Sequence, residues 1–290
     1  MNKKNTAFCL YSKEKADDSG IESLKIFLPS GQGYINHNIV HSVSDKSKCD
    51  IWRLSLVYFC DSELNRIKPL TRSGAEWEMA LKLSGRPDFI GGYAHGDEVF
   101  QSIKVKVDGR EVTLESLEAQ TQFDSLSFEV FSTGYDPCDS ITEVLLHYKK
   151  ITVEGLAVRV EQRVEWLGSY ELGRSYMAMM PPLKTVTDCY CTDIDPIKKP
   201  INLAENISGC GADAVCLCGE DGFGFEMKVE KYLTDGERGN SFLITDNGGV
   251  PYNKMYFILH HSGAVNKGDV WETVTIYTVD CTASSCKNIK

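Results

Sequence analysis

The chain has 290 residues, of which 42% are hydrophobic and 25% are charged. These proportions are those of ordinary globular proteins, and a chain of this length can bury a core without help from disulfides. The formal net charge of −10 argues against a non-specific nucleic-acid binder, because such proteins present a basic face.

The N-terminal residues do not match an export signal. Only four apolar residues, at positions 7–10, follow the early lysines, and a signal peptide needs a longer apolar run. No stretch of the chain reaches the length of a membrane span. We therefore expect a cytoplasmic protein with no membrane partner, which leaves the cell only by lysis or by a specialised route.

The first ambiguous element covers residues 75–83. Its residue types favour a helix, but Trp77, Met79, Leu81 and Leu83 alternate with Glu78 and other residues. Because the surrounding sequence has strand patterns and a Gly-Arg-Pro stop follows, we predict a strand.

Turn signals then predict two hairpins. Asp108-Gly109 separates two alternating runs within residues 102–114 and supplies the positive φ angles of a tight turn. Glu154-Gly155 separates residues 148–153 from residues 156–166 in the same way. Residues 113–121 are the best helix candidate, and this helix would be short.

The clearest strand covers residues 158–167, where charged side chains occupy every second position. This period of two is typical of a half-buried antiparallel strand, and it recurs in residues 223–229 and 271–279. Residues 193–211 form only a loop-sized break. The sequence therefore predicts an all-β fold: one large antiparallel β-sandwich over residues 1–290, with at most short helices.

The strongest functional signal lies in residues 88–98. Gly91-Gly92 permits a sharp bend, and Tyr93, His95, Asp97 and Glu98 follow at once. A histidine beside a carboxylate can hold a pKa suited to proton transfer near neutral pH. We therefore predict that these four residues are catalytic, although a polar turn with a capping histidine would give the same pattern.

Several residues are candidates for sugar binding in the first quarter of the chain. His37 and His41 are four apart, so on a strand they share one face and could line a cleft or bind a metal. Trp52 and Trp77 could stack on sugar rings, and Arg53 could pair with a carboxylate. The alternative is that the histidines are structural, that Trp52 is in the core, and that Arg53 covers it.

Arg174 and Tyr176 follow the clear strand and complete the predicted substrate-binding set. Arginine would neutralise an acid group, and tyrosine would move a proton. His147 lies inside a strand pattern, where a packed or surface histidine is ordinary, so we assign it no role.

The eleven cysteines are odd in number, so they cannot all pair within one chain. One group consists of Cys189, Cys191, Cys210, Cys216 and Cys218, which suggests zinc. However, both close pairs have a one-residue spacer, whereas structural zinc pairs usually have two. We expect buried thiols, no metal and no cofactor, although the sequence leaves metal binding by this group open.

The later half resembles the galactose mutarotase-like supersandwich proteins, which include sugar epimerases and the β domains of polysaccharide lyases. The resemblance rests on the charged strand at residues 158–167, on Tyr-Met-Ala-Met-Met-Pro-Pro at 176–182, and on Gly-Asp-Val-Trp-Glu at 268–272. Members of this group pair a histidine with a carboxylate, or use tyrosine, histidine and arginine in eliminations. The resemblance implies such roles for His95, Glu98 and Tyr93.

These observations favour a carbohydrate-active protein that acts on a sugar or uronate by proton transfer, as an epimerase or a lyase. His95 would be the acid or base, with Glu98 or Asp97 as its partner. The alternative of a non-catalytic carbohydrate-binding module, of phage or prophage type, would instead use Trp52, Trp77 and Tyr93 for stacking. A structural assembly protein is the third alternative, and the oligomeric state is left open.

Overall fold

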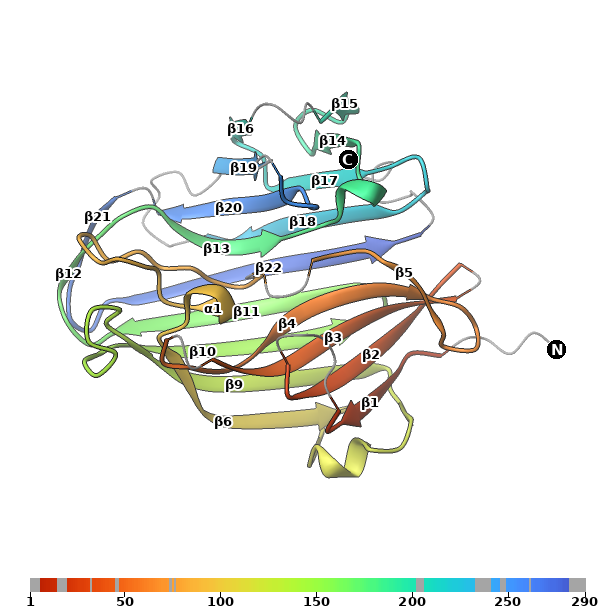
Figure 1. Ribbon diagram of the computed structural model, residues 1–290, viewed down its shortest axis with the longest axis horizontal. Coiled ribbons are helices and arrows are strands. Elements are labelled where there is room, and N and C mark those ends of the chain that lie inside the picture. Colours follow the sequence, from red (N-terminus) through yellow and green to blue (C-terminus); the bar gives the residue numbers. More distant parts are fainter. Residues whose placement is uncertain are drawn as a thin grey trace.

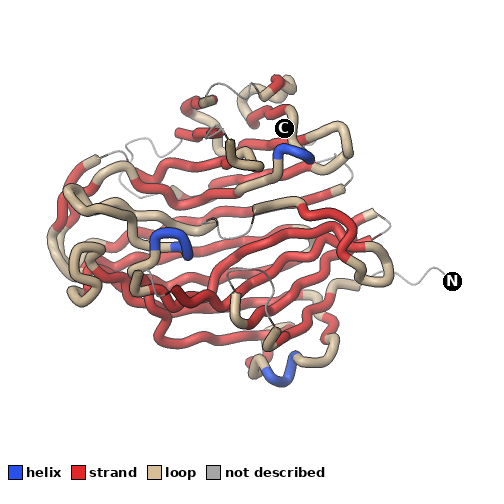
Figure 2. The backbone as a smooth tube through the Cα atoms, in the orientation of Figure 1, coloured by secondary structure: helices blue, strands red, loops and turns tan. Residues whose placement is uncertain are grey.

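Strands account for most of the chain, and the helical segments are short (Figure 2). The computed structural model describes residues 6–14, 20–31, 33–44, 47–72, 75, 77–201, 206–232, 241–245, 249–260 and 262–281. The prediction of an all-β sandwich with short helices is confirmed. The helical segments are α1 (Gly92–His95) and the 3₁₀ turns η1 (Glu115–Leu117) and η2 (Lys184–Val186).

The largest sheet runs through both halves of the chain. Its first part contains β1 (Phe8–Ser12), β2 (Glu22–Ser30), β3 (Gly33–Ser44), β4 (Cys49–Cys60) and β5 (Arg66–Pro69). Its second part contains β6 (Glu98–Val107), β7 (Arg110–Val112), β8 (Thr121–Gln122), β9 (Ser125–Tyr135), β10 (Glu143–Glu154), β11 (Ala157–Trp166), β14 (Cys189–Thr192), β15 (Lys199–Pro200), β17 (Ala214–Cys218), β18 (Gly224–Lys231) and β22 (Val270–Asp280). The main strand order is β15-β14-β17-β18-β22-β11-β10-β9-β6-β4-β3-β2-β1-β8.

Two smaller sheets complete the fold. One pairs β12 (Tyr170–Leu172) with β21 (Gly263–Val265), and the other has the order β13-β20-β19-β16. The strands of the second are β13 (Ser175–Met180), β16 (Ile207–Cys210), β19 (Ser241–Thr245) and β20 (Lys254–His260).

The large sheet folds back on itself between β4 and β6. These two strands pair in parallel over only two residue pairs. Beyond this junction, β2, β3 and β4 cross over the later strands (Figure 1). The Trp52 ring of β4 lies 5.2 Å from the Phe128 ring of β9, so the two layers are in contact. One hydrophobic cluster, which extends from Cys9 to Val279, fills the space between them.

Both predicted hairpins are present. Asp108 and Gly109 have φ angles of 49° and 77° and join β6 to β7. Gly155, with φ of 60°, lies in the turn from β10 to β11. The predicted strand at residues 158–167 is β11, and its alternate residues from Val158 to Trp166 are buried. Local turn chemistry and the period of two were sufficient to predict these elements.

The predictions for residues 75–83 and 113–121 were wrong in part. The described residues of the first segment form only isolated bridges, including Ala80 to Tyr176 and Leu81 to Ile90. Glu76 lies outside the described residues. Glu78 and Ala80 are buried as well as Trp77, because this segment crosses the interior and is covered on both sides. The second segment has the single turn η1 in place of a longer helix, and its last residue begins β8.

Candidate functional site

The loop before β6 folds back on itself because three glycines adopt positive φ angles. Gly91, Gly92 and Gly96 have φ of 105°, 77° and 81°, a region that glycine enters without steric cost. A Cβ on Gly96 would lie 1.8 Å from Ser47 Oγ and 2.7 Å from Ser47 Cβ, so a larger residue would require Ser47 to move. The reversal contains α1 and brings residue 95 close to residue 88.

This reversal creates a histidine–carboxylate pair. His95 Nδ1 lies 2.6 Å from Asp88 Oδ1, and both side chains are partly exposed. The Phe89 ring lies 4.8 Å from the imidazole and limits its rotation. A carboxylate at Nδ1 fixes the ring orientation and stabilises the imidazolium that forms when the other nitrogen takes a proton.

The pair lies at the wall of a surface hollow of about 420 Å³, a size within the range of small-ligand sites. The lining residues come from three separated segments: Ser44, Ser47, Pro87, Asp88, Tyr93, Ala94, His95, Asp97, Pro137 and Ser140. Three of the four predicted catalytic residues are therefore together: Tyr93, His95 and Asp97.

The described lining of the hollow is acidic and rich in hydroxyl groups. Asp88 and Asp97 are its carboxylates, and the lining that the structure describes has no lysine or arginine. Ser140 donates a hydrogen bond of 2.6 Å to Asp97 Oδ1, which holds that buried side chain in place. Such a lining suits a neutral, hydroxylated ligand better than an anionic one, because like charges repel.

Glu98, one of the two partners predicted for His95, contacts His147 instead, and His95 contacts Asp88. Glu98 is buried, because β6 turns its side chain inward. Its Oε1 lies 2.8 Å from His147 Nδ1 and accepts a bond of 2.5 Å from Ser132 Oγ. Burial alone would raise the pKa of Glu98, but His147, Lys149 and Ser132 outweigh it and hold the pKa at about 2.

A second buried ion pair lies between the layers. Lys149 Nζ lies 3.3 Å from Glu78 Oε1 and donates a bond of 2.7 Å to the Trp52 carbonyl. The same carboxylate oxygen accepts a bond of 2.7 Å from the Leu54 amide. Gln162 donates to the carbonyls of Glu78 and Met177. These polar groups hold the interior segment at residue 78 between β4 and β10.

The three other aromatic and cationic candidates near the N-terminus are in the interior. Trp52 and Trp77 are at most 1% exposed, so neither offers a ring face to a sugar. Arg53 is also buried, and its contacts include Ser42 Oγ and the Leu54 carbonyl. Its guanidinium lies 5.3 Å from the Tyr93 ring centre, so it supports the hollow from beneath. The prediction that these three residues contact a sugar was wrong, because all three side chains are buried.

His37 and His41 share β3 but have different surroundings. His41 lies between two carboxylates, with Nδ1 2.7 Å from Glu22 and Nε2 2.6 Å from Asp50. Its ring stacks on Trp52. His37 is fully buried and its Nε2 has no hydrogen-bond partner, so it lines no cleft. Among the described residues, no group of three or more His, Cys, Asp or Glu side chains is placed to hold a metal ion.

His37 should make the protein sensitive to mild acid. Burial lowers its pKa from 6.5 to about 4, so the unfolded chain binds more protons between these values. Stability is therefore lost as the pH falls through this window, by about 2–3 kcal/mol between pH 7.5 and 4.5. Urea unfolding of the His37→Leu variant should show a correspondingly flatter dependence on pH. An unchanged slope would contradict the assignment. The Glu98 carboxyl, with its pKa of about 2, loses its contribution only at lower pH.

Arg174 and Tyr176 lie at the start of β13, outside the hollow. Arg174 is exposed, and Tyr176 is partly buried. The Tyr176 ring lies 6.1 Å from the Phe89 ring, and the Phe89 ring contacts His95. Tyr176 is therefore linked to the site only through Phe89. Their predicted roles in substrate binding stay predictions.

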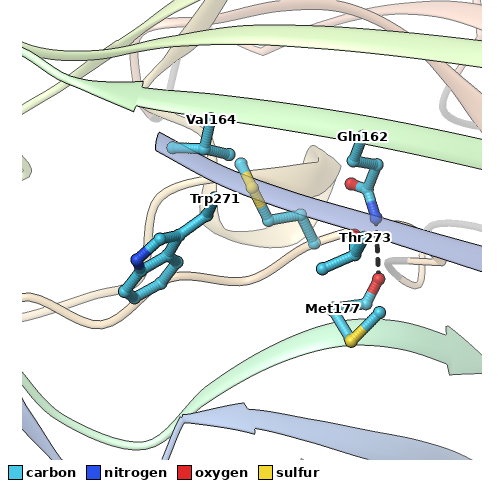
Figure 3. Close-up of a pocket in the computed structure, with 6 residues that line it drawn as sticks. Gln162, Val164, Met177, Trp271 and Thr273 are labelled. Carbon is cyan, nitrogen blue, oxygen red and sulfur yellow. Dashed lines mark hydrogen bonds between the residues drawn. The ribbon is translucent and has the colours of Figure 1, made fainter. Parts of the chain in front are cut away.

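The cavity that the described residues leave between the layers near β11 and β22 is too small for a sugar. A cavity of about 10 Å³ lies near β11 and β22, with Gln162, Val164, Met177, Trp271 and Thr273 around it (Figure 3). This volume corresponds to one water molecule at most. Two larger surface hollows, of about 440 and 270 Å³, have no histidine among their lining residues.

Sequence reasoning missed Asp88 and the residues that complete the hollow. Asp88 is seven residues before His95, and only the fold-back at Gly91 and Gly92 brings them together. The paired glycines were therefore the signal that could have identified it. Ser47 and Ser140 come from distant turns, and the local sequence contains nothing that places them here.

None of the helices in the described part of the chain is long and apolar enough to cross a membrane. No protein-family model matches the chain. A search of curated proteins also finds no match.

Solved structures with a similar fold include two GH36 α-galactosidases from Geobacillus stearothermophilus. AgaB has 8% sequence identity and a TM-score of 0.53, over 90% of this chain and 40% of that chain. A variant of AgaA in complex with 1-deoxygalactonojirimycin has 9% identity and a TM-score of 0.53, over 90% of this chain and 41% of that chain. Galactose 1-epimerase from Lactobacillus acidophilus NCFM has 7% identity and a TM-score of 0.46, over 94% and 98%.

At these identities the likeness shows the fold alone. The fold is a large β-sandwich like the matched part of these α-galactosidases, which is consistent with the predicted resemblance to galactose mutarotase-like proteins. The chain spans about 40% of the length of the α-galactosidases that it matches.

Proposed function

We propose that this protein binds a neutral sugar in the hollow at His95 and transfers a proton on it. The observation that carries the proposal is the 2.6 Å contact between His95 Nδ1 and Asp88 Oδ1 at the wall of that hollow. The fold, which carbohydrate-active enzymes share, is consistent with a carbohydrate ligand but does not assign a reaction.

The geometry supports His95 as the base. If Nδ1–H donates to Asp88, the lone pair of the imidazole is on Nε2, and this nitrogen takes the proton from a sugar hydroxyl. Asp88 then stabilises the resulting imidazolium. Tyr93 lines the same hollow, and its hydroxyl is our candidate for returning a proton to the ring oxygen. The result is ring opening and closure of the kind that an epimerase of the sugar anomeric centre needs.

The charge of the hollow favours this reaction over uronate elimination. An elimination needs a cation near the uronate carboxylate, whereas the described lining contains Asp88 and Asp97 and no arginine or lysine. Arg53, which the sequence offered as a partner for a carboxylate, is buried, with its guanidinium 5.3 Å from the Tyr93 ring centre. The binding-module alternative loses support, because Trp52 and Trp77 are both in the core.

NMR titration of protein with labelled histidine tests the ligand class. Galactose and glucose should shift the His95 signals and those of few other histidines. Galacturonate and glucuronate should bind at least about tenfold more weakly, because their carboxylate meets Asp88 and Asp97. The proposal fails if no neutral sugar perturbs His95, or if the uronates bind more tightly.

A further inference from the structure

Four cysteines meet on one face of the β14–β17 strand pair, apart from the hollow at His95. Cys189 lies directly opposite Cys218, and Cys191 lies directly opposite Cys216. Residues two apart on a strand point the same way, so all four thiols share a face and pack together as one cluster.

One of these facing pairs is placed for a covalent bond. Cys189 Sγ lies 2.8 Å from Cys218 Sγ, in contact but unbonded. Directly opposed residues of antiparallel strands have Cα atoms about 4.5–5.5 Å apart, which is within the range that a disulfide spans. Little backbone movement is therefore needed to close the bond.

Access distinguishes this pair from its neighbour. Cys189 is partly exposed, whereas Cys218, Cys191 and Cys216 are buried. An oxidant in solution can therefore reach one thiol of the first pair and neither thiol of the second. The Cys216 Sγ–H instead donates to Glu226 Oε2, at 3.6 Å.

We propose that Cys189 and Cys218 form a reversible disulfide when the protein meets a hydroperoxide. The Cys189 thiolate attacks the distal peroxide oxygen, the O–O bond breaks, and a sulfenic acid forms with release of water or alcohol. The Cys218 sulfur then attacks the sulfenic sulfur, the S–O bond breaks, and water leaves as the S–S bond forms. Two thiols are oxidised and one peroxide is reduced, and a dithiol reductant reverses the change.

The bond would close the chain from residue 189 to residue 218. This stretch contains the short strands β15 and β16 and ends in the interior of the large sheet at β17. Oxidation would therefore fasten an edge segment to the sheet. Burial and the neighbouring Cys218 thiol raise the pKa of Cys189, so the reaction should be slow at neutral pH and faster in mild alkali.

The test is oxidation of dilute full-length protein with hydrogen peroxide at about pH 8.5, followed by alkylation and peptide mapping without reduction. A peptide pair joined through Cys189 and Cys218, lighter by two hydrogens, is expected, and dithiothreitol should restore both thiols. The melting temperature of the oxidised protein should rise by roughly 5 °C or more. Cys191 and Cys216 should remain reduced and provide the internal control.

Two variants sharpen the result. Cys218→Ser should stop the reaction at a Cys189 sulfenic acid that dimedone traps, whereas Cys191→Ser should still form the bond. The proposal is overturned if Cys189 pairs instead with the exposed Cys138 or Cys210, or if both thiols of the pair stay reduced while those two are oxidised. If either variant fails to fold, the peptide map of the unaltered protein decides alone.

Discussion

Replacing His95 with alanine should lower the rate of sugar proton transfer by about 10²–10⁴-fold and leave the fold intact. The reason is that His95 is the proposed base and lies partly exposed at the hollow, so its ring contributes little to the core. Asp88→Asn should lower kcat in the same direction with little change in KM, because it removes the charge that stabilises the imidazolium. Anomer exchange followed by NMR measures both variants.

His41 provides the matched control for His95. It also lies 2.6 Å from an aspartate, Asp50, but it is outside the hollow. His41→Ala should therefore keep the rate per folded molecule. A rate loss shared equally by the His41 and His95 variants would reject the active site. Weaker sugar binding with an unchanged kcat would reassign His95 to positioning the ligand.

Glu78→Gln alone should reduce the free energy of unfolding by about 3–5 kcal/mol, because it leaves the buried Lys149 without its carboxylate. Lys149→Met alone should have a loss of similar size. The double variant should recover most of it, since glutamine still accepts the Leu54 amide bond and methionine fills the space of the lysine stem. Urea unfolding of the four proteins completes the cycle.

An exposed ion pair gives the comparison. Lys104 and Glu111 lie 3.0 Å apart on the surface, and Glu111→Gln should leave stability almost unchanged. Additive losses in the Glu78 and Lys149 variants, without recovery in the double variant, would show that the two groups do not depend on each other.

The sequence was sufficient for the elements whose cause is local. The hairpins at Asp108-Gly109 and Gly155 follow from turn chemistry, and the strand after Gly155 follows from its alternating charges. The strand predicted at residues 75–83 was wrong, because local reasoning could not foresee that Glu78 is buried. Its burial depends on Lys149, which is 71 residues away. No local pattern contains that information.

The candidate site was predictable to a similar extent. The loop that carries Tyr93, His95 and Asp97 was identified because glycines and titratable groups are adjacent in the sequence. Glu98, one of the two partners predicted for His95, is close in the chain but on the inward side of β6, where it contacts His147. The sugar contacts predicted for Trp52 and Trp77 also failed, because both rings are buried. The sequence does not show which tryptophans the rest of the chain will cover.

The place of β22 in the large sheet constrains the order in which the protein can fold. It pairs with β11 on one side and with β18 on the other, although more than 100 residues separate β11 from it in the chain. Until β22 is inserted, β11 and β18 each present an unpaired edge, with the backbone groups that attract other strands. Strand pairs between residues that are distant in the chain form slowly. Incompletely folded chains would therefore aggregate through the unpaired edges of β11 and β18 in the middle of the sheet.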